Sequence, residues 1–265
     1  MSQTEQGQVS RSAADIYEGF FVPALFREPA KYVAEAADIR SGQSVLDVAC
    51  GTGVLARAAV AFTGDARNVT GLDRNEGMLA VARHLEPRVN WQHGLAEALP
   101  FTNQSFERVF NQFGLMFSDD RGGALQEMRR VMKVSGRMHV TVWDSLDRNL
   151  GYAAMVNLLN RLFGAKLADA LRVPFVLGEP ETLCKIFSDA DLSVAHWETF
   201  DVTARFPSLE AWVQTDIKGW TLADMIDEDQ FRTLLREARR ELGSFEHSDG
   251  SVTFNSPAHL VITAG

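Results

Sequence analysis

The sequence predicts a doubly wound α/β fold: one seven-stranded sheet with its last strand antiparallel, an N-terminal helical lid and C-terminal helical insertions. From Ser44 onward, short apolar runs alternate with amphipathic helical segments, which is the order typical of a parallel sheet. A glycine-rich turn follows the first of these runs directly. After Trp143 the alternation lapses, and longer helical segments separate the last apolar runs.

The chain before the sheet has the apolar spacing of helices. Between residues 13 and 37 apolar side chains recur at helical intervals, and Pro23 and Pro29 are expected to break this stretch into separate helices. Five strands follow, with Gly136 expected in the turn before the fifth. These strands are predicted at 44–49, 68–73, 89–93, 106–112 and 137–143, with helices at about 54–62, 76–84 and 121–132.

The second half of the sequence is less regular than the first. A loop from Pro174 to Pro180 interrupts its helical stretches. Two further strands are expected in this half, and they could pair antiparallel with each other. Helices are predicted near 151–163, 180–189 and 208–242, and strands near 193–204 and 251–263.

Length, composition and charge limit the class of protein. The 265 residues suit a helical lid at 1–40 and one ligand-binding domain at 41–265, with insertions at about 145–190 and 208–243. With 46% hydrophobic residues and no apolar run of about 18 residues, the composition is that of a soluble protein without a membrane span. A net charge of −9 disfavours nucleic acid as a partner, because clustered Lys and Arg bind its phosphates.

The cysteines and the first residues indicate the compartment. Cys50 lies in a glycine-rich turn and Cys184 in a helical stretch, which argues against a disulfide framework or a cysteine metal site. The first residues are polar and lack the apolar core of a signal peptide. We expect a cytoplasmic protein, monomeric or homodimeric.

The main candidate for a ligand site is the turn after the first strand. In VLDVACGTG, residues 45–53, a buried strand ends in a tight turn and a helix begins directly after it. Glycine lets the backbone approach a ligand closely, and the start of a helix offers free N–H groups. These features predict a nucleotide-like ligand.

Two interpretations of this turn compete. Gly51 and Gly53, followed by Ala56 and about twenty residues later by Asp73, also fit a degenerate dinucleotide fingerprint. Asp47 favours the other interpretation, because a carboxylate before the glycines would repel a pyrophosphate but can pair with a ligand ammonium, directly or through water. A ligand with an amino-acid moiety fits better.

Asp73 ends the second strand, where a carboxylate can accept hydrogen bonds from both hydroxyls of a ribose. Its alternative role is the N-cap of the next helix, although Asn75 could fill that role instead. We expect Asp73 to bind a ribose.

Three runs of the sequence resemble the successive motifs of a known family. VLDVACGTG, GLDRNEGMLAVAR and GLAEALPF are similar to the motifs of the class I S-adenosylmethionine (SAM)-dependent methyltransferases, especially the ubiquinone/menaquinone-biosynthesis-like (type 11) branch. The resemblance covers roughly residues 14 to 145. It implies a Rossmann-like sheet, S-adenosyl-L-methionine as the cofactor with S-adenosyl-L-homocysteine as the product, and methylation of a small-molecule acceptor.

The resemblance also implies which residues hold the cofactor. Gly51 and Gly53 would lie against the methionine and ribose parts of SAM, and Asp73 would bind the ribose hydroxyls. Asp47 would orient the glycine turn and the amino group of the ligand.

The adenine would be held by the second and third motifs. Arg74 and Met78 would flank the ring, since the Met78 thioether offers a polarisable apolar face. Leu95 stands where the family usually has Asp or a small polar residue, so the backbone around Leu95 and Ala96 would replace the missing acceptor.

The fourth strand ends with Asn111 and Gln112, followed by Phe113, where an open parallel sheet keeps its ligand crevice. These three residues should line the cofactor and substrate cleft. The run Asn-Gln-Phe-Gly differs from the polar-Pro-Pro-aromatic run of the adenine N-methyltransferases, which weakens an amine-methylating assignment.

Aromatic and methionine side chains are candidate walls for a flat or hydrophobic acceptor, although each is equally explained as core. The Tyr17 hydroxyl could meet the cofactor carboxylate or the acceptor. The candidates are Tyr17, Phe20, Phe21, Phe113, Met116 and Trp143, with Trp212 and Trp220 in the late insertion.

Methyl transfer is an in-line displacement that mainly needs alignment and exclusion of water. None of the six histidines has a motif context, so the sequence names no catalytic residue, and no His or carboxylate pair recurs at metal-ligand spacing. We expect a metal-independent enzyme that transfers a methyl group to O, N or C of an aromatic or hydrophobic metabolite.

Two other functions compete with this one. A NAD-linked oxidoreductase would usually need a catalytic Tyr/Lys pair, and none of the three tyrosines has the Tyr-x-x-x-Lys spacing. A SAM-binding protein without transfer activity, acting as a sensor or partner subunit, stays open because intact binding residues do not prove turnover. The acceptor and the methylated atom are not fixed by the sequence.

Overall fold

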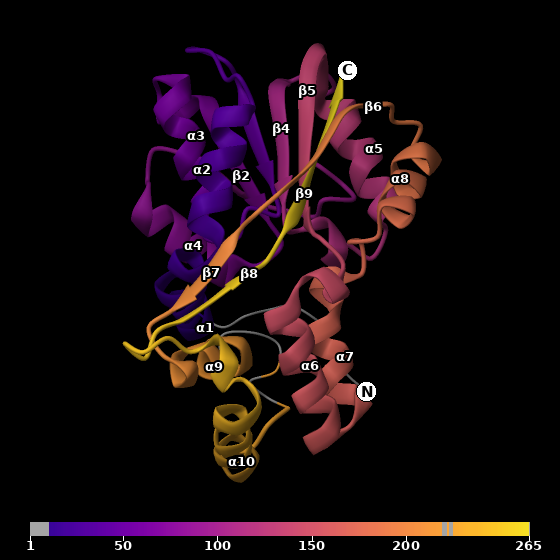
Figure 1. Ribbon diagram of the computed structural model, residues 1–265. Helices are drawn as coiled ribbons and strands as arrows, with labels where there is room; N and C mark the ends of the chain where they lie inside the picture. Colours follow the sequence, from indigo (N-terminus) through magenta and orange to yellow (C-terminus); the bar gives the residue numbers. More distant parts are fainter. Residues whose placement is uncertain (1–10, 219–221, 223–224, 265) are drawn as a thin grey trace, which may run out of the picture.

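The computed structural model describes residues 11–218, 222 and 225–264, and its core is the predicted sheet (Figure 1). Seven strands lie in the order β3-β2-β1-β4-β5-β9-β6. The first five along the chain pair in parallel, whereas β9 pairs antiparallel with both β5 and β6, which confirms the predicted fold class. The strands are β1 (Val45–Val48), β2 (Val69–Asp73), β3 (Asn90–His93), β4 (Phe106–Gln112), β5 (Met132–Trp143), β6 (Val194–Phe200) and β9 (Ala258–Ala264).

The central strands are apolar on both sides because helices cover both faces of the sheet. In β1, Val45 packs in the core that contains α2 and α3, while its neighbour Leu46 packs in the opposite core, with α5 and α8. These helices are α2 (Arg27–Ala36), α3 (Val54–Thr63), α4 (Glu76–Leu85), α5 (Arg121–Val131) and α8 (Pro180–Asp189). The predicted bounds of α3, α4, α5 and α8 agree with these to within one residue.

The N-terminal helical stretch is continuous, so the breaks predicted at Pro23 and Pro29 are wrong. α1 (Arg11–Ile16) leads into the π-helix η1 (Tyr17–Phe26), and α2 follows directly. The Arg27 N–H donates to the Val22 carbonyl, five residues back, as the wider π-helix requires. Pro23 lies inside this wider segment and Pro29 in the first turn of α2, and neither ends the helical stretch.

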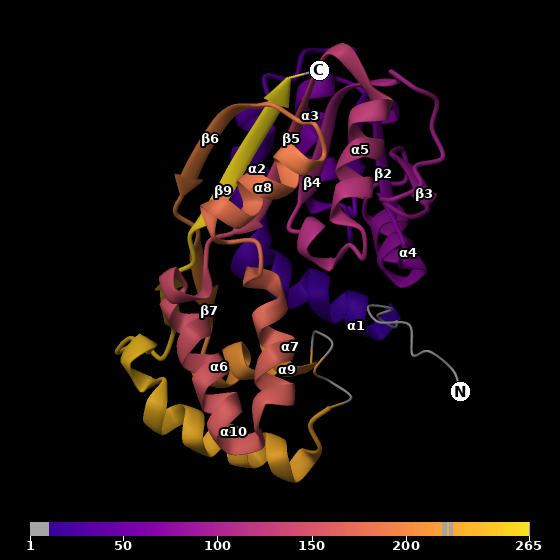
Figure 2. The same ribbon diagram turned by 90° about the vertical axis from the view of Figure 1, so that its right-hand side faces the viewer.

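Four helices of the second half form a layer beyond the carboxyl ends of the parallel strands (Figure 2). We call it the helical layer; it consists of α6 (Leu150–Phe163), α7 (Ala165–Arg172), α9 (Leu209–Lys218) and α10 (Glu228–Glu241). The short helix α7 was not predicted, and the predicted segment 208–242 divides into α9 and α10. Within the described ranges, no helix is long and apolar enough to cross a membrane.

Both late strands are divided as well. A small separate sheet is formed by β7 (Thr203–Phe206) and β8 (Val252–Asn255), which pair antiparallel, while β6 and β9 belong to the central sheet. The Ser256 N–H donates to the Val202 carbonyl at the point where both pairs of strands bend. Short 3-10 turns complete the fold: η2 (Ala66–Asn68), η3 (Leu115–Phe117), η4 (Leu146–Arg148), η5 (Val173–Phe175) and η6 (Gly243–Phe245).

Gly136 lies inside β5 and not in a turn before it, which corrects the sequence-based prediction. The pairing of β4 with β5 shifts register here, from Phe106 opposite Met132 to Arg108 opposite Arg137. A Cβ atom on Gly136 would lie 2.9 Å from the Lys133 carbonyl oxygen. Glycine therefore permits the bulge that lets one long strand begin at Met132.

Candidate functional site

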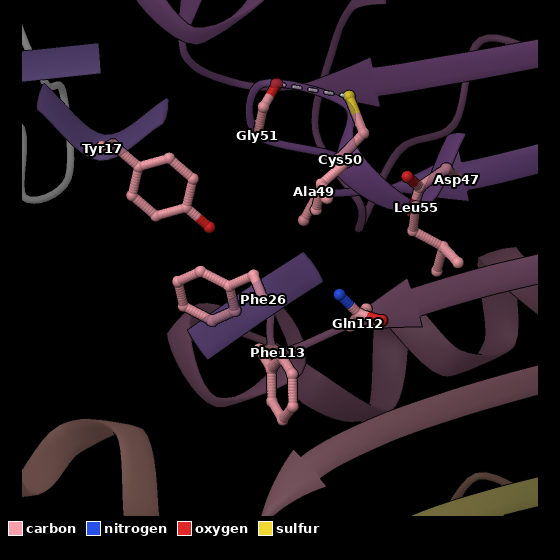
Figure 3. Close-up of a pocket in the computed structure, with 10 residues that line it drawn as sticks. Tyr17, Phe26, Asp47, Ala49, Cys50, Gly51, Leu55, Gln112 and Phe113 are labelled. Atoms are coloured by element: carbon pink, nitrogen blue, oxygen red, sulfur yellow. Dashed lines mark hydrogen bonds between the residues drawn. The ribbon is translucent and has the colours of Figure 1, made fainter. Parts of the chain in front are cut away.

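A hollow of about 350 Å³, counted with its open mouth, lies where β1 and β4 end and η1 passes over them (Figure 3). This is the place where an open parallel sheet offers a ligand crevice. Its walls come from η1, the turn after β1, the first turn of α3 and the end of β4. They are Tyr17, Phe26, Asp47, Ala49, Cys50, Gly51, Val54, Leu55, Gln112 and Phe113.

The turn after β1 is tight because three of its residues have left-handed backbone conformations: Ala49, Gly51 and Gly53. The Gly53 N–H donates to the Cys50 carbonyl at 2.8 Å, and α3 begins at the next residue. The first N–H groups of α3 therefore lie at the hollow, where they can bind polar ligand atoms.

The two glycines of this turn do different things. A Cβ on Gly51 would approach the Tyr17 ring at 3.9 Å, so the bare side of Gly51 faces the hollow and its roof. The corresponding space at Gly53 is filled by the indole of Trp91, whose Cζ3 would lie 2.7 Å from the added atom. Gly53 is thus required by the packing of Trp91, and it is not among the residues that line the hollow.

Asp73 shapes the glycine turn from the end of β2. Its Oδ2 accepts the Gly51 N–H at 2.8 Å, and its Oδ1 accepts the Asn75 N–H at 2.7 Å. Burial raises the pKa of Asp73, while the two N–H groups lower it. Asn75 is the N-cap of α4 and accepts the Met78 N–H, so Asp73 is not needed as a cap.

Asp47 lies at the bottom of the hollow and is buried. Its Oδ2 accepts the Ala56 N–H at 3.0 Å. Asp47 thus provides the hydrogen bond to the first turn of α3 that the N-cap residue Gly53, which has no side chain, cannot provide. Burial raises the pKa of Asp47 to about 8, although the hydrogen bond from Ala56 opposes the shift. A carboxyl group held this way favours a cationic ligand group beside it, which would stabilise its ionised form.

The roof of the hollow comes from η1. Tyr17 points its hydroxyl toward the hollow and stacks on Phe26, with ring centroids 5.3 Å apart (Figure 3). Burial raises the pKa of the Tyr17 hydroxyl, and the negative charge of Asp73 adds to this effect. Glu18 forms an ion pair with Arg57 of α3 at 2.7 Å, which ties the roof to the helix below it.

The far wall is aromatic. Phe113 stacks on Trp143 with ring centroids 3.9 Å apart and an angle of 10° between the planes, and Phe26 packs against both rings. Gln112 adds a polar atom, because its Oε1 is buried and has no hydrogen-bond partner in the described chain. This wall therefore offers a flat aromatic surface and one polar side chain, whose amide nitrogen lies on the side of the hollow (Figure 3).

Several predicted residues do not line the hollow. Arg74 faces Asp119 at 3.9 Å, and Met78 is buried with Ala14 and Val81, with Tyr17 packed against the group. Leu95, half of whose surface is exposed, forms an isolated bridge with Ala98. The predicted cofactor residues outside the lining are Gly53, Asp73, Arg74, Met78, Leu95, Ala96 and Asn111.

Asn111 is fully buried, and its side-chain amide donates to the Val48 carbonyl at 3.1 Å, so it joins β4 to β1. Of the predicted acceptor walls, Tyr17 and Phe113 line the hollow and Trp143 backs Phe113. Phe21, Met116 and Trp212 are buried in the main core, and Phe20 is about half exposed. Trp220 lies outside the described residues.

The sequence analysis missed several walls of the hollow, namely Phe26, Ala49, Cys50, Val54 and Leu55. The position of Ala49, Cys50, Val54 and Leu55 in the motif could have revealed them, whereas Phe26 reaches the hollow only through the π-helix. Among the described residues no group of His, Cys, Asp or Glu could hold a metal ion.

The region around this turn is similar in sequence to a known protein family. Residues 45–136 match a family described as "Methyltransferase domain". A ubiquinone/menaquinone biosynthesis C-methyltransferase of Legionella pneumophila is 38% identical over 116 residues, which are 42% of this chain and 46% of that protein. A protein of the same description from Paraburkholderia phytofirmans is 37% identical over 142 residues, 51% of this chain and 58% of that protein. The chain spans about half the length of the curated relatives it matches.

Solved structures share the fold over most of the chain. The YcgJ protein from Bacillus subtilis aligns with a TM-score of 0.61 and 23% identity, covering 89% of this chain and 97% of that one. Phosphoethanolamine N-methyltransferase 2 from Haemonchus contortus, in complex with phosphomonomethylethanolamine and S-adenosylhomocysteine, aligns with a TM-score of 0.58 and 17% identity. It covers 96% of this chain and 57% of that one. At these identities the likeness concerns the fold, and it agrees with the resemblance inferred from the three motifs.

Proposed function

We propose that this chain, whose residues 45–136 match a methyltransferase domain, is a class I SAM-dependent methyltransferase that transfers the methyl group of SAM to a small molecule. The observation that carries the proposal is the hollow beside the glycine turn, where Asp47, Gly51 and Gln112 line one space and Asp73 supports it. Its polar groups match a ligand with an ammonium at one end and a ribose in the middle.

The described residues fit SAM by their unused hydrogen-bonding capacity. Each Asp73 oxygen accepts one backbone N–H and keeps a further lone pair for a ribose hydroxyl. The Asp47 carboxyl can accept a hydrogen bond from an ammonium. The bare face of Gly51 lets the ligand lie against the backbone.

The chemistry rests on position more than on proton transfer. Bound SAM supplies an electrophilic methyl group on a sulfonium, which reacts in line with a nucleophile. Tyr17 and Phe26 cover the hollow from η1, so this segment acts as a lid that excludes water. Among the described residues no histidine lines the hollow, which supports an acceptor nucleophile that needs little help from a base.

The acceptor is an aromatic or hydrophobic metabolite that is methylated on O, N or C. The stacked pair of Phe113 and Trp143 supports this class, because a flat ring can add to an existing aromatic stack. The names of the relatives, which act in quinone biosynthesis, make quinol rings the first acceptors to try. The net charge of −9 supports a small molecule over nucleic acid.

Calorimetric titration with SAM and S-adenosylhomocysteine, run beside NAD, tests the cofactor. We expect micromolar binding of both SAM compounds to the wild type and at least about tenfold weaker binding to Asp73→Asn, since hydrogen bonds to a charged group contribute about 1.5–3 kcal/mol. Asp65→Asn, the same change on an exposed loop, is the control. Binding of NAD alone would overturn the proposal.

Turnover then separates an enzyme from a SAM-binding sensor. Radiolabelled methyl transfer from SAM to quinols, phenols and amines should give product with at least one acceptor. Tight SAM binding without transfer to any member of a broad panel would favour the sensor.

A further inference from the structure

The helical layer contains a buried carboxyl group, that of Asp216. Asp216 of α9 is 1% exposed, and in the part of the chain that the structure describes neither of its oxygens has a hydrogen-bond partner. Lys218, two residues further on, lies over the Phe231 ring at 4.4 Å and pairs with Glu228, so it is directed elsewhere. Burial raises the pKa of Asp216 well above its usual value.

Aromatic rings surround this carboxyl. Trp212 lies one helical turn before Asp216, and its indole N–H lowers the pKa of that carboxyl without making a hydrogen bond of normal geometry. Tyr152 of α6 is close enough that the charge of Asp216 raises the pKa of its hydroxyl, in addition to the larger effect of burial. Trp212 and Tyr152 both pack on Phe254, with ring centroids 4.6 and 5.4 Å away.

The Asp216 side chain lies at the same end of the sheet as the hollow. The helical layer is placed beyond the carboxyl ends of the strands (Figure 2), and α9 packs against η1, which roofs the hollow. Tyr152 also contacts Phe175 of η5, and η5 packs against η3, the turn that follows Phe113. Asp216 therefore lies at the same end of the sheet as the hollow, and η1, η3 and η5 connect the two regions.

A buried carboxyl with no partner is unfavourable for folding, and such groups concentrate at functional sites. The surroundings select its partner: an ammonium supplies three N–H donors and a positive charge, and aromatic rings attract cations. The net charge of −9 also favours the approach of a cation. A neutral hydroxyl would satisfy only one oxygen.

We propose that Asp216, flanked by Tyr152 and Trp212, binds a protonated amine on the methyl acceptor and so determines which acceptors the enzyme takes. This inference rests on the proposed function, because it assigns the acceptor side of the same site. The amine is the group that is held, while the methylated atom lies at the hollow.

Matched pairs of ligands test the proposal. Tyramine and 4-ethylphenol, and likewise tryptamine and 3-ethylindole, differ by the ammonium group alone. Their binding is measured by calorimetry on protein saturated with S-adenosylhomocysteine, in the wild type, in Asp216→Asn and in Glu210→Gln. Glu210 lies on the same helix but pairs at the surface with Arg239, so its variant is the matched control.

We expect the wild type and Glu210→Gln to bind at least one amine about tenfold more tightly than its neutral partner, and Asp216→Asn to lose this preference. Equal binding within every pair, absent amine binding, or a preference that survives in Asp216→Asn would overturn the assignment. The wild-type comparison needs no variant, so it decides the question even if Asp216→Asn does not fold. Binding of S-adenosylhomocysteine is measured separately. If the wild type does not bind it, that result would count against the proposed function and not against the role of Asp216.

Discussion

Replacement of Gly53 by alanine separates two explanations for a glycine in the cofactor motif. If Gly53 is bare only to let a ligand approach, the variant should lose affinity for S-adenosylhomocysteine and little stability. The structure places the Trp91 indole where the new Cβ would go, and the Trp91 Nε1–H is fixed by a hydrogen bond to the Glu86 carbonyl at 2.8 Å. We therefore expect a loss of stability in the absence of any ligand.

The expected magnitude has two parts. The φ angle of +82° adds left-handed strain of roughly 1–2 kcal/mol for a residue with a Cβ. Displacing a packed ring adds about 1–3 kcal/mol of overpacking. Gly42→Ala measures the first part alone, because Gly42 has a φ of +84° and open space around its Cβ position. The free energy of unfolding of Gly53→Ala should fall by about 2–5 kcal/mol.

Urea unfolding of the wild type, Gly53→Ala, Trp91→Ala and the double variant measures the coupling. In the Trp91→Ala background the overpacking disappears, so Gly53→Ala should cost no more than Gly42→Ala costs in the wild type. The coupling free energy should be about 1–3 kcal/mol, well above the roughly 0.5 kcal/mol expected of independent sites. Equal costs of Gly53→Ala in both backgrounds would refute the steric explanation.

Two further changes test the carboxyl groups around the hollow. Because the pKa of Asp47 is about 8 in the folded protein and 3.8 in a free chain, the folded state holds a proton that the unfolded chain releases, and stability should fall as the pH rises from about 4 to 8. Asp47→Asn should lack this part of the pH dependence. In urea unfolding at pH 5, 7 and 9, the free energy of unfolding of the wild type should therefore fall relative to that of Asp47→Asn as the pH rises. A difference between the two proteins that does not change with pH would contradict this prediction. Glu18→Gln should cost about 1 kcal/mol and speed amide hydrogen exchange across η1, since it removes the ion pair with Arg57. Glu35→Gln, which removes the exposed ion pair with Lys31, is the control variant. Equal amide exchange across η1 in both variants would mean that the Glu18–Arg57 pair does not hold η1 in place.

The sheet was predictable because its strands are buried on both faces and its helices are bounded by strong local signals. Gly51 and Gly53 precede α3, and Asn75 caps α4, so both helices begin where the sequence indicates. The helical layer was less predictable. α7 is short, and the bend near Val202 that divides β6 from β7 depends on pairing with a strand more than fifty residues away.

The positions of several residues at the hollow were predictable from the strand ends on which they lie. Asp47, Gly51 and Gln112 line the hollow, and Asp73 hydrogen-bonds to the turn, as expected for strand ends that meet at one edge. Trp91 could not be foreseen, because only the parallel pairing of β2 with β3 brings its ring to Gly53. Asp216 gave no signal either, since burial without a partner is a property of the folded helical layer.

The π-helix changes which side chains share a face. With about 3.6 residues per turn, the nine steps from Tyr17 to Phe26 would make two and a half turns, so the two rings would point in opposite directions. When each hydrogen bond reaches one residue further, nine steps make about two full turns, and the rings come to the same side. The two rings can therefore stack, with centroids 5.3 Å apart, because the π-helix turns less per residue than an α-helix. A helical wheel drawn at 100° per residue would place Phe26 on the side opposite Tyr17, although both rings line the hollow.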